Sequence, residues 1–174
     1  MSRDRDTGGR PRNARPRDAL GRPLDRDGAG ADRIPDDLSL AGPDAARLAD
    51  ELLRAGRPFH AHEVLEASWK FGPAGERDLW QGLAQIAVGL THAHRGNARG
   101  AVALLTRGTQ RVRVYQAASP TASPASAARD RSYGIDLGAF LAASEALAAR
   151  IDRDGLADIP AADLRPGLIP DLDG

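Results

Sequence analysis

The stretch from residue 58 to residue 96 reads PFHAHEVLEASWKFGPAGERDLWQGLAQIAVGLTHAHRG and decides the fold of the chain. Its opening proline stands where prolines begin helices, and an uninterrupted helical pattern runs over residues 58–71. The letters GPAG at 72–75 break that pattern, and a second helical run covers about 76–95, where Gly96 stops it. Two helices joined by so short a connection pack antiparallel. We therefore predict a helical hairpin at the centre of the domain.

Three further helices are predicted around this hairpin. Pro43 and Asp44 open an amphipathic run that ends at Gly56. Asn97 and Asp136 are good N-cap residues, and they predict helices to about residue 118 and to about residue 151. No stretch alternates apolar and polar residues as a half-buried strand does. The fold class is therefore predicted as all-α, a compact bundle of about five helices.

The two ends of the chain differ in composition from this middle part. Residues 1–38 mix arginine, aspartate, glycine and proline and hold few large apolar side chains. Such a segment buries too little surface to offset its ordering entropy, so we predict a disordered N-terminal arm. Residues 39–151 form the predicted helical domain. Residues 152–174 carry isolated leucines and isoleucines between prolines, and we predict a tail that lies extended along the surface.

Composition and charge exclude several classes of protein. The 174 residues include no cysteine, which excludes disulfides and thiolate metal sites. The 24 basic and 24 acidic side chains cancel, which argues against broad affinity for nucleic acid or anionic membranes, and we interpret the arginines of residues 95–111 as a solvated face. No apolar run reaches the length of a membrane span or resembles a signal peptide. We expect a cytoplasmic protein, and its alanine and arginine usage is typical of a GC-rich bacterial genome.

A cluster of polar and aromatic residues points to function. His62, Glu66 and Trp69 follow at intervals of four and three, so they share one face of the helix over 58–71. Counting outward from the turn places Glu66 opposite Gln81 and His62 opposite Gln85 on the antiparallel partner. Burying an imidazole and a carboxylate is costly unless they bond each other, a metal or a ligand. The sequence therefore predicts a polar pocket between the two helices.

Two interpretations of this pocket stay open. In the functional one it binds a small polar ligand or a divalent metal, because an imidazole and a carboxylate four residues apart are half of a divalent site that His92 could complete. Metal-assisted hydrolysis with Glu66 or Glu63 as base would then be the natural reaction, although no nucleophile or cofactor loop supports an enzyme. In the structural one, His62 simply bonds Glu66 inside a non-catalytic interaction module.

Two further sets of residues carry expectations. His60 and His94 are expected to face solvent. Gly82, Gly89 and Gly96 recur every seven residues, and small residues on one side let another backbone approach closely, at a loss of about 1 kcal/mol of helix propensity per glycine. That approach would come from a neighbouring helix of the same chain or from a second copy in a homodimer.

The segments HAHEVLEASW and WQGLAQIAVGLTHAHRGNARGAVALL together resemble the domain of unknown function 309 family, whose members are small bacterial and archaeal proteins. The family pattern H-x-x-x-E-x-x-W/Y is met by His62, Glu66 and Trp69. A glutamine-bearing helix and a G-N-x-x-G-A turn follow it in the family and here. The resemblance covers about residues 44–118 and implies a small all-helical domain. It also implies that the His/Glu motif is a suggested metal-binding site in proteins of no established activity.

Overall fold

The computed structural model describes residues 16–18, 20–25, 34–35, 40, 42–118 and 133–170. These residues form five α-helices and one short 3-10 helix, and they contain no β-strand, which confirms the all-α prediction. The elements are α1 (Gly42–Arg54), α2 (Pro58–Phe71), η1 (Ala74–Glu76), α3 (Arg77–His94), α4 (Ala98–Ala118) and α6 (Leu137–Asp154). Within the described part of the chain, none of these helices has the length and apolarity that crossing a membrane requires.

The helix ends follow the local signals in the sequence. Helix α2 begins and ends at the predicted residues, and the GPAG turn leads into η1 before α3 starts. Asp136 caps α6, because its carboxylate accepts a hydrogen bond from the backbone N–H of Ala139 at 2.9 Å. Asn97 caps α4 in the same way through the N–H of Gly100 at 2.9 Å. Helix α6 continues three residues beyond the predicted end at 151, to Asp154.

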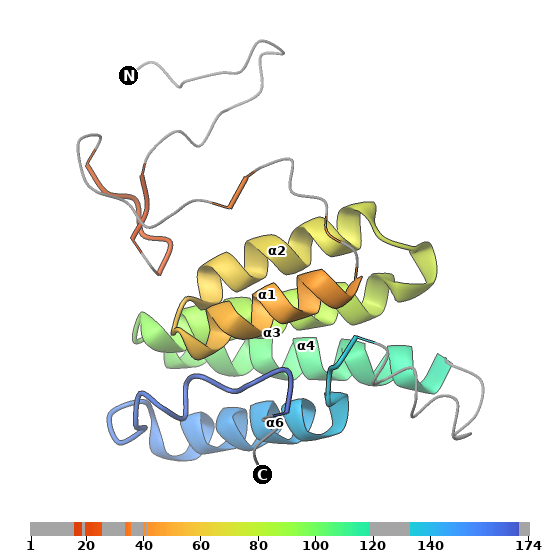
Figure 1. The fold of residues 1–174 in the computed structure, drawn as a ribbon. Coiled ribbons are helices and arrows are strands. Elements are labelled where there is room, and N and C mark those ends of the chain that lie inside the picture. The colour runs from red at the N-terminus through yellow and green to blue at the C-terminus, as the bar shows by residue number, and fades with distance from the viewer. Residues whose placement is uncertain are drawn as a thin grey trace.

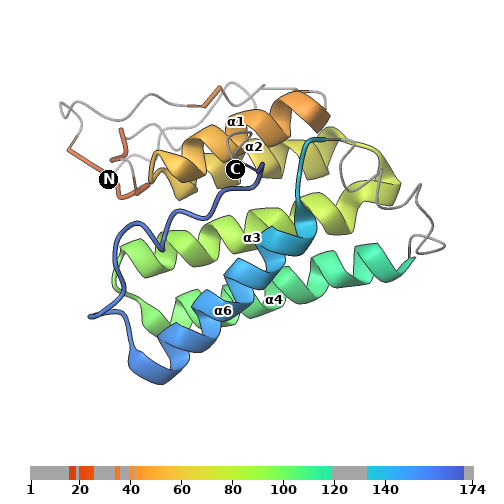
Figure 2. The ribbon, with the colours of Figure 1, turned by 60° about the horizontal axis from the view of Figure 1, so that its bottom comes forward.

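Helices α2, α3 and α4 follow one another as antiparallel neighbours, with α3 in the middle. Helix α1 packs against α2, and α6 packs against α4 (Figures 1 and 2). The core between them is built from leucine, isoleucine and alanine side chains together with Trp80, whose exposed fraction is 1%. The candidate site lies on α2 and α3, among polar side chains that are only partly buried.

Two glycines of the predicted repeat, Gly82 and Gly89, allow α3 and α4 to pack closely within the chain. A Cβ added at Gly82 would lie 2.6 Å from Cγ2 of Val112, and one at Gly89 would lie 3.0 Å from Leu105, so α4 lies directly against both glycines. Gly96 instead adopts φ +78 in the turn after α3. The glycine-lined side of α3 is thus covered by α4. It is not the homodimer surface that was one of the two expectations, and the oligomeric state itself stays a prediction.

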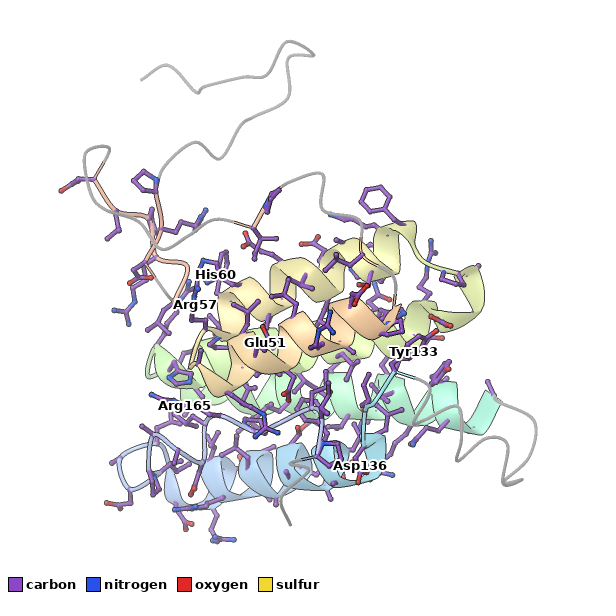
Figure 3. The ribbon with its side chains drawn as sticks, in the orientation of Figure 1. Glu51, Arg57, His60, Tyr133, Asp136 and Arg165 are labelled. Atoms are coloured by element: carbon purple, nitrogen blue, oxygen red, sulfur yellow. The ribbon has the colours of Figure 1, made fainter. Side chains whose placement is uncertain are left out.

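A network of three polar side chains closes the end of the bundle where α2 turns into α3. The carboxylate of Glu76 accepts hydrogen bonds from Nε1 of Trp80 at 2.9 Å and from the hydroxyl of Tyr133 at 2.5 Å. The rings of Trp80 and Tyr133 lie 5.4 Å apart. Figure 3 shows Tyr133 at this end, opposite the end that carries Arg57 and His60.

The segment after α6 runs back along α1 (Figure 2). One carboxylate oxygen of Asp50 accepts hydrogen bonds from the backbone N–H of Leu168 at 2.6 Å and of Ile169 at 2.9 Å. Leu164 and Leu168 are buried. The predicted tail is therefore more than a surface cover, because it contributes side chains to the core.

The predicted disorder of residues 1–38 falls mostly outside the described residues, and the predicted loop at 119–128 falls entirely outside them. Both stay predictions, as do the domain limits at residues 38 and 151.

Candidate functional site

One side of α2 is neither fully buried nor fully exposed, and it carries His62, Glu66 and Trp69. The buried residues of α2 form a broad arc, because this helix packs against both α1 and α3. The three predicted site residues border that arc and are partly buried. The exposed fraction is 25% for the His62 side chain and 34% for that of Glu66. The two side chains are therefore partly buried and partly exposed to solvent.

Glu66 lies between two basic side chains of its own helix. Its Oε1 pairs with Nζ of Lys70 at 2.7 Å, and its Oε2 lies 3.6 Å from Nε2 of His62. The second distance is too long for a good hydrogen bond, so Lys70 is the closer partner of this carboxylate. Burial lowers the pKa of His62 below 6.5, the Glu66 carboxylate raises it in part, and the Lys70 ammonium lowers it further. Near pH 7 the imidazole is therefore neutral.

This balance predicts how the ring of His62 titrates. We expect an NMR titration to give His62 a pKa below 6.5, because burial is the largest influence on it. Glu66→Gln should lower that pKa further, since the neighbouring negative charge is lost. Lys70→Met should raise it. His94, whose pKa is lowered by its own burial, is the internal control and should not respond to either substitution.

The same shift predicts a pH dependence of stability. The unfolded chain binds more protons than the folded chain at pH values between the lowered pKa and 6.5. The free energy of unfolding should therefore fall as the pH drops below about 6.5, and His94 should contribute in the same direction. A His62 that titrates at or above 6.5 would contradict the described burial.

Two hydrogen-bond acceptors on this edge have no partner among the described residues. They are Nδ1 of His62 on α2 and Oε1 of Gln85 on α3, and both atoms are buried. Because Nε2 of the neutral ring faces the Glu66 carboxylate, we place the ring proton on Nε2, which leaves Nδ1 as an acceptor. A buried acceptor without a partner costs about 1–3 kcal/mol. Such groups in a folded protein call for a specific explanation.

The contact between Trp69 and Arg77 supports the predicted register of the two helices. The guanidinium of Arg77 lies 5.9 Å from the centre of the Trp69 ring, and Nζ of Lys70 lies 5.8 Å from it. In an antiparallel pair, stepping two turns away from this contact on both helices brings His62 level with Gln85. The two unpartnered acceptors therefore belong to facing stretches of α2 and α3.

Gln81 belongs to a different set of contacts. Its side-chain oxygen accepts a hydrogen bond from Nη1 of Arg111 on α4, and the same nitrogen pairs with Asp78 at 3.0 Å. The predicted glutamine face is thus divided, since Gln81 joins α3 to α4, whereas Oε1 of Gln85 has no hydrogen-bond partner among the described residues. Sequence spacing gave no sign of Arg111, because it lies 30 residues further along the chain.

The three predicted metal ligands do not come together. Nδ1 of His92 lies 2.8 Å from the side-chain nitrogen of Asn97, so this imidazole is engaged at the end of α3. Among the residues that the structure describes, no three histidine, aspartate or glutamate side chains are grouped so that they could hold a metal ion. The set of His62, Glu66 and His92 is therefore not assembled, because the α3–α4 turn draws His92 to Asn97.

The other two histidines are not solvent-facing as expected. His60 has an exposed fraction of only 3%, because the arc of α2 that packs against its neighbours is wider than the spacing of its apolar residues suggested. His94 is partly buried, with Nε2 3.2 Å from the carbonyl oxygen of Leu164 in the C-terminal segment. The burial of both side chains depends on how the helices and the C-terminal segment pack, which helical spacing alone does not show.

We call His62, Glu66 and Trp69 of α2 together with Gln85 of α3 the polar face. It combines a neutral imidazole, a carboxylate held by lysine, a half-buried indole and two acceptors without a partner among the described residues. The two buried acceptors thus have capacity for hydrogen bonds that the described residues do not supply.

Comparison with known proteins places this face in a recognised family segment. Residues 47–104 match the family model described as Domain of unknown function (DUF309). The "Uncharacterized protein YpuF" of Bacillus subtilis (strain 168) is 40% identical over 60 residues, which are 34% of this chain and 33% of that protein. The chain thus spans about a third of the length of this curated relative, and no solved structure matches. The resemblance to the domain of unknown function 309 family is confirmed over residues 47–104, which contain α2, α3 and the whole polar face.

Proposed function

We propose that the polar face binds a small polar ligand that carries N–H or O–H donors, such as an amine, an amide or a guanidine. The observation that carries this proposal is the pair of buried acceptors, Nδ1 of His62 and Oε1 of Gln85, which have no partner among the described residues. A ligand that donates to both would satisfy two groups that otherwise reduce stability. Because the two acceptors belong to facing stretches of α2 and α3, one molecule would reach both.

The neighbouring side chains would have supporting roles. Glu66 faces Nε2 of His62, which favours the ring proton on that nitrogen, and Lys70 holds the carboxylate in an ion pair. Trp69, which is partly exposed, would contact the carbon part of the ligand with the part of its ring that Lys70 and Arg77 leave open. In this proposal the domain is a binding module, and no group on the polar face acts as a nucleophile.

A divalent metal would use the same lone pairs, and it is the competing occupant. Zinc sites in proteins usually combine at least three side-chain ligands. The polar face offers one imidazole and one carboxylate that is already paired with Lys70. The donor set thus fits a hydrogen-bonding ligand better than a metal, and zinc becomes a control in the test.

The test is an NMR titration of protein labelled with ¹⁵N and carrying no histidine tag. Methylammonium, methylguanidine and acetamide serve as donor probes, acetate as an acceptor-only probe, and ZnCl₂ as the metal probe. We expect the donor probes to shift the Nδ1 resonance of His62 and the side-chain amide of Gln85. Acetate should leave both unchanged.

A matched pair of variants makes the assignment specific. Gln85→Leu removes one acceptor and should weaken donor-probe binding about tenfold. Gln110→Leu makes the same change at an exposed position of α4 and should bind as the unaltered protein does. Equal weakening in both variants, or a response of His62 to ZnCl₂ alone, would overturn the proposal.

A further inference from the structure

A small N-terminal turn lies against the end of the polar face. We define it by the described residues 16–18 and 20–25, which precede α1. Figure 1 shows this segment beside the start of α2, where Figure 3 places Arg57 and His60. It is therefore positioned to affect what reaches the polar face from that end.

Hydrogen bonds within the turn give it a shape of its own. One carboxylate oxygen of Asp18 accepts from the backbone N–H of Leu20 at 2.9 Å and of Arg22 at 2.8 Å. The N–H of Leu24 donates to the carbonyl of Pro16 at 2.7 Å, which closes the turn. Because these bonds are internal, the turn can move away from the helices as a unit without losing them.

The turn contacts α2 through the ring of Phe59. The backbone of Gly21 lies so close to this ring that a Cβ at that position would come within 2.3 Å of its carbon atoms. The guanidinium of Arg17 lies 5.6 Å from the ring centre, and its Nη1 donates to the carbonyl of Gly21 at 2.6 Å. The glycine also has φ +72, a conformation that other residues rarely adopt.

Phe59 connects the turn to the polar face. It precedes His62 by three residues, so both lie on one side of α2. The two rings are 6.2 Å apart. Phe59 is thus packed between the turn and the imidazole that carries an unpartnered acceptor.

Arg95 connects the turn to the end of α3 through hydrogen bonds. Both Nε and Nη2 of Arg95, just after the end of α3, donate to the carbonyl oxygen of Leu20, with Nε at 2.9 Å. The turn therefore joins the start of α2 to the end of α3, the two places that border the His62 end of the polar face. Among the described residues, these attachments are an exposed arginine and an aromatic ring, which makes them weaker than the packing of the core.

We propose that the N-terminal turn is a lid that controls access to His62. In the docked position Gly21 and Arg17 hold Phe59 against the imidazole. Release of Leu20 from Arg95 lets the turn swing away and frees Phe59 to rotate. The proposal rests on the proposed function for its purpose, because a ligand would enter at this end, but the motion has its own readout.

The experiment measures the rate at which diethyl pyrocarbonate modifies His62 in the full chain, assigned by tandem mass spectrometry. His94 serves as the internal reference. Two variants should open the lid. Arg95→Ala removes the hydrogen bonds to the carbonyl oxygen of Leu20, and Gly21→Ala places a methyl group where the ring of Phe59 lies. We expect each to raise the relative rate at His62 about tenfold.

Matched controls repeat the chemical change elsewhere. Arg99→Ala alters an exposed arginine four residues later, in α4, and Gly75→Ala adds a Cβ where no atom lies within 4 Å. Both should leave the rate at His62 unchanged. Hydrogen exchange of the Leu20 and Gly21 amides reports whether the turn has left the helices.

The outcomes separate the lid from the binding proposal. Faster modification of His62 in the opened variants supports the lid, even if the donor probes fail to bind and the proposed function falls. An unchanged rate despite faster amide exchange in the turn overturns the lid. Unchanged exchange in an Arg95→Ala/Gly21→Ala double variant also overturns it, because the described contacts would then not hold the turn.

Discussion

Asp50→Ala is expected to lower the free energy of unfolding by about 3 kcal/mol. The carboxylate has an exposed side-chain fraction of only 12%, and it accepts from Nε of Arg54 at 2.8 Å as well as from the backbone of Leu168 and Ile169. Its removal takes this acceptor from two backbone N–H donors and from Nε of Arg54. Urea unfolding monitored by tryptophan fluorescence gives the change.

Asp44→Ala is the matched control for this prediction. Asp44 pairs with Arg47 at 2.7 Å in the same helix, but the exposed side-chain fractions of the two are 52% and 67%. Exposed pairs contribute little, so the loss should be about 1 kcal/mol or less. Hydrogen exchange should show faster exchange of the Leu168 amide in Asp50→Ala only. Equal losses in both variants would mean that Asp50 does not hold the C-terminal segment.

Gly82→Leu is expected to cost about 3 kcal/mol, because an ordinary side chain cannot fit between α3 and α4. A Cβ there would lie 2.6 Å from Val112 and 2.9 Å from the carbonyl oxygen of Gly108. The gain of about 1 kcal/mol in helix propensity does not offset this crowding. Thermal unfolding with light scattering on the same samples measures stability and molecular mass together.

Gly75→Leu makes the same substitution in the turn before α3, where a Cβ would have no atom within 4 Å of it. Its stability should change by less than about 1 kcal/mol. If the glycine side of α3 were instead a contact between two copies, Gly82→Leu would halve the molecular mass while each subunit kept its stability. That result would contradict the packing of α3 against α4 within one chain.

Local signals in the sequence were sufficient to predict about where the helices begin and end. Pro58 and the GPAG turn delimit α2, and the side chains of Asn97 and Asp136 cap the helices that follow them. These signals act over a few residues, so their effect does not depend on the rest of the fold. The glycine repeat predicted a close approach of backbones, but nothing local distinguishes an approach within the chain from one between copies.

Which side chains come together at the site depends on contacts between residues that are distant in the sequence. Helical spacing brought His62, Glu66 and Trp69 to one edge of α2, but it could not show that Arg111 binds Gln81 or that Asn97 holds His92. Nor could it show that Gly21, 38 residues before Phe59 in the sequence, lies on that ring. Side-chain pairings of this kind are set by which surfaces meet after the helices pack, and hydrophobic periodicity does not encode them.

The bond between Asp50 and the backbone at residues 168 and 169 spans 118 and 119 positions of the chain. During synthesis, α1 therefore leaves the ribosome long before the amides that complete its buried face exist. The nascent helical hairpin can form from neighbouring residues while that carboxylate still faces water. Completion of the domain thus requires its C-terminal segment, since a chain that ends before residue 168 lacks both amides that Asp50 binds.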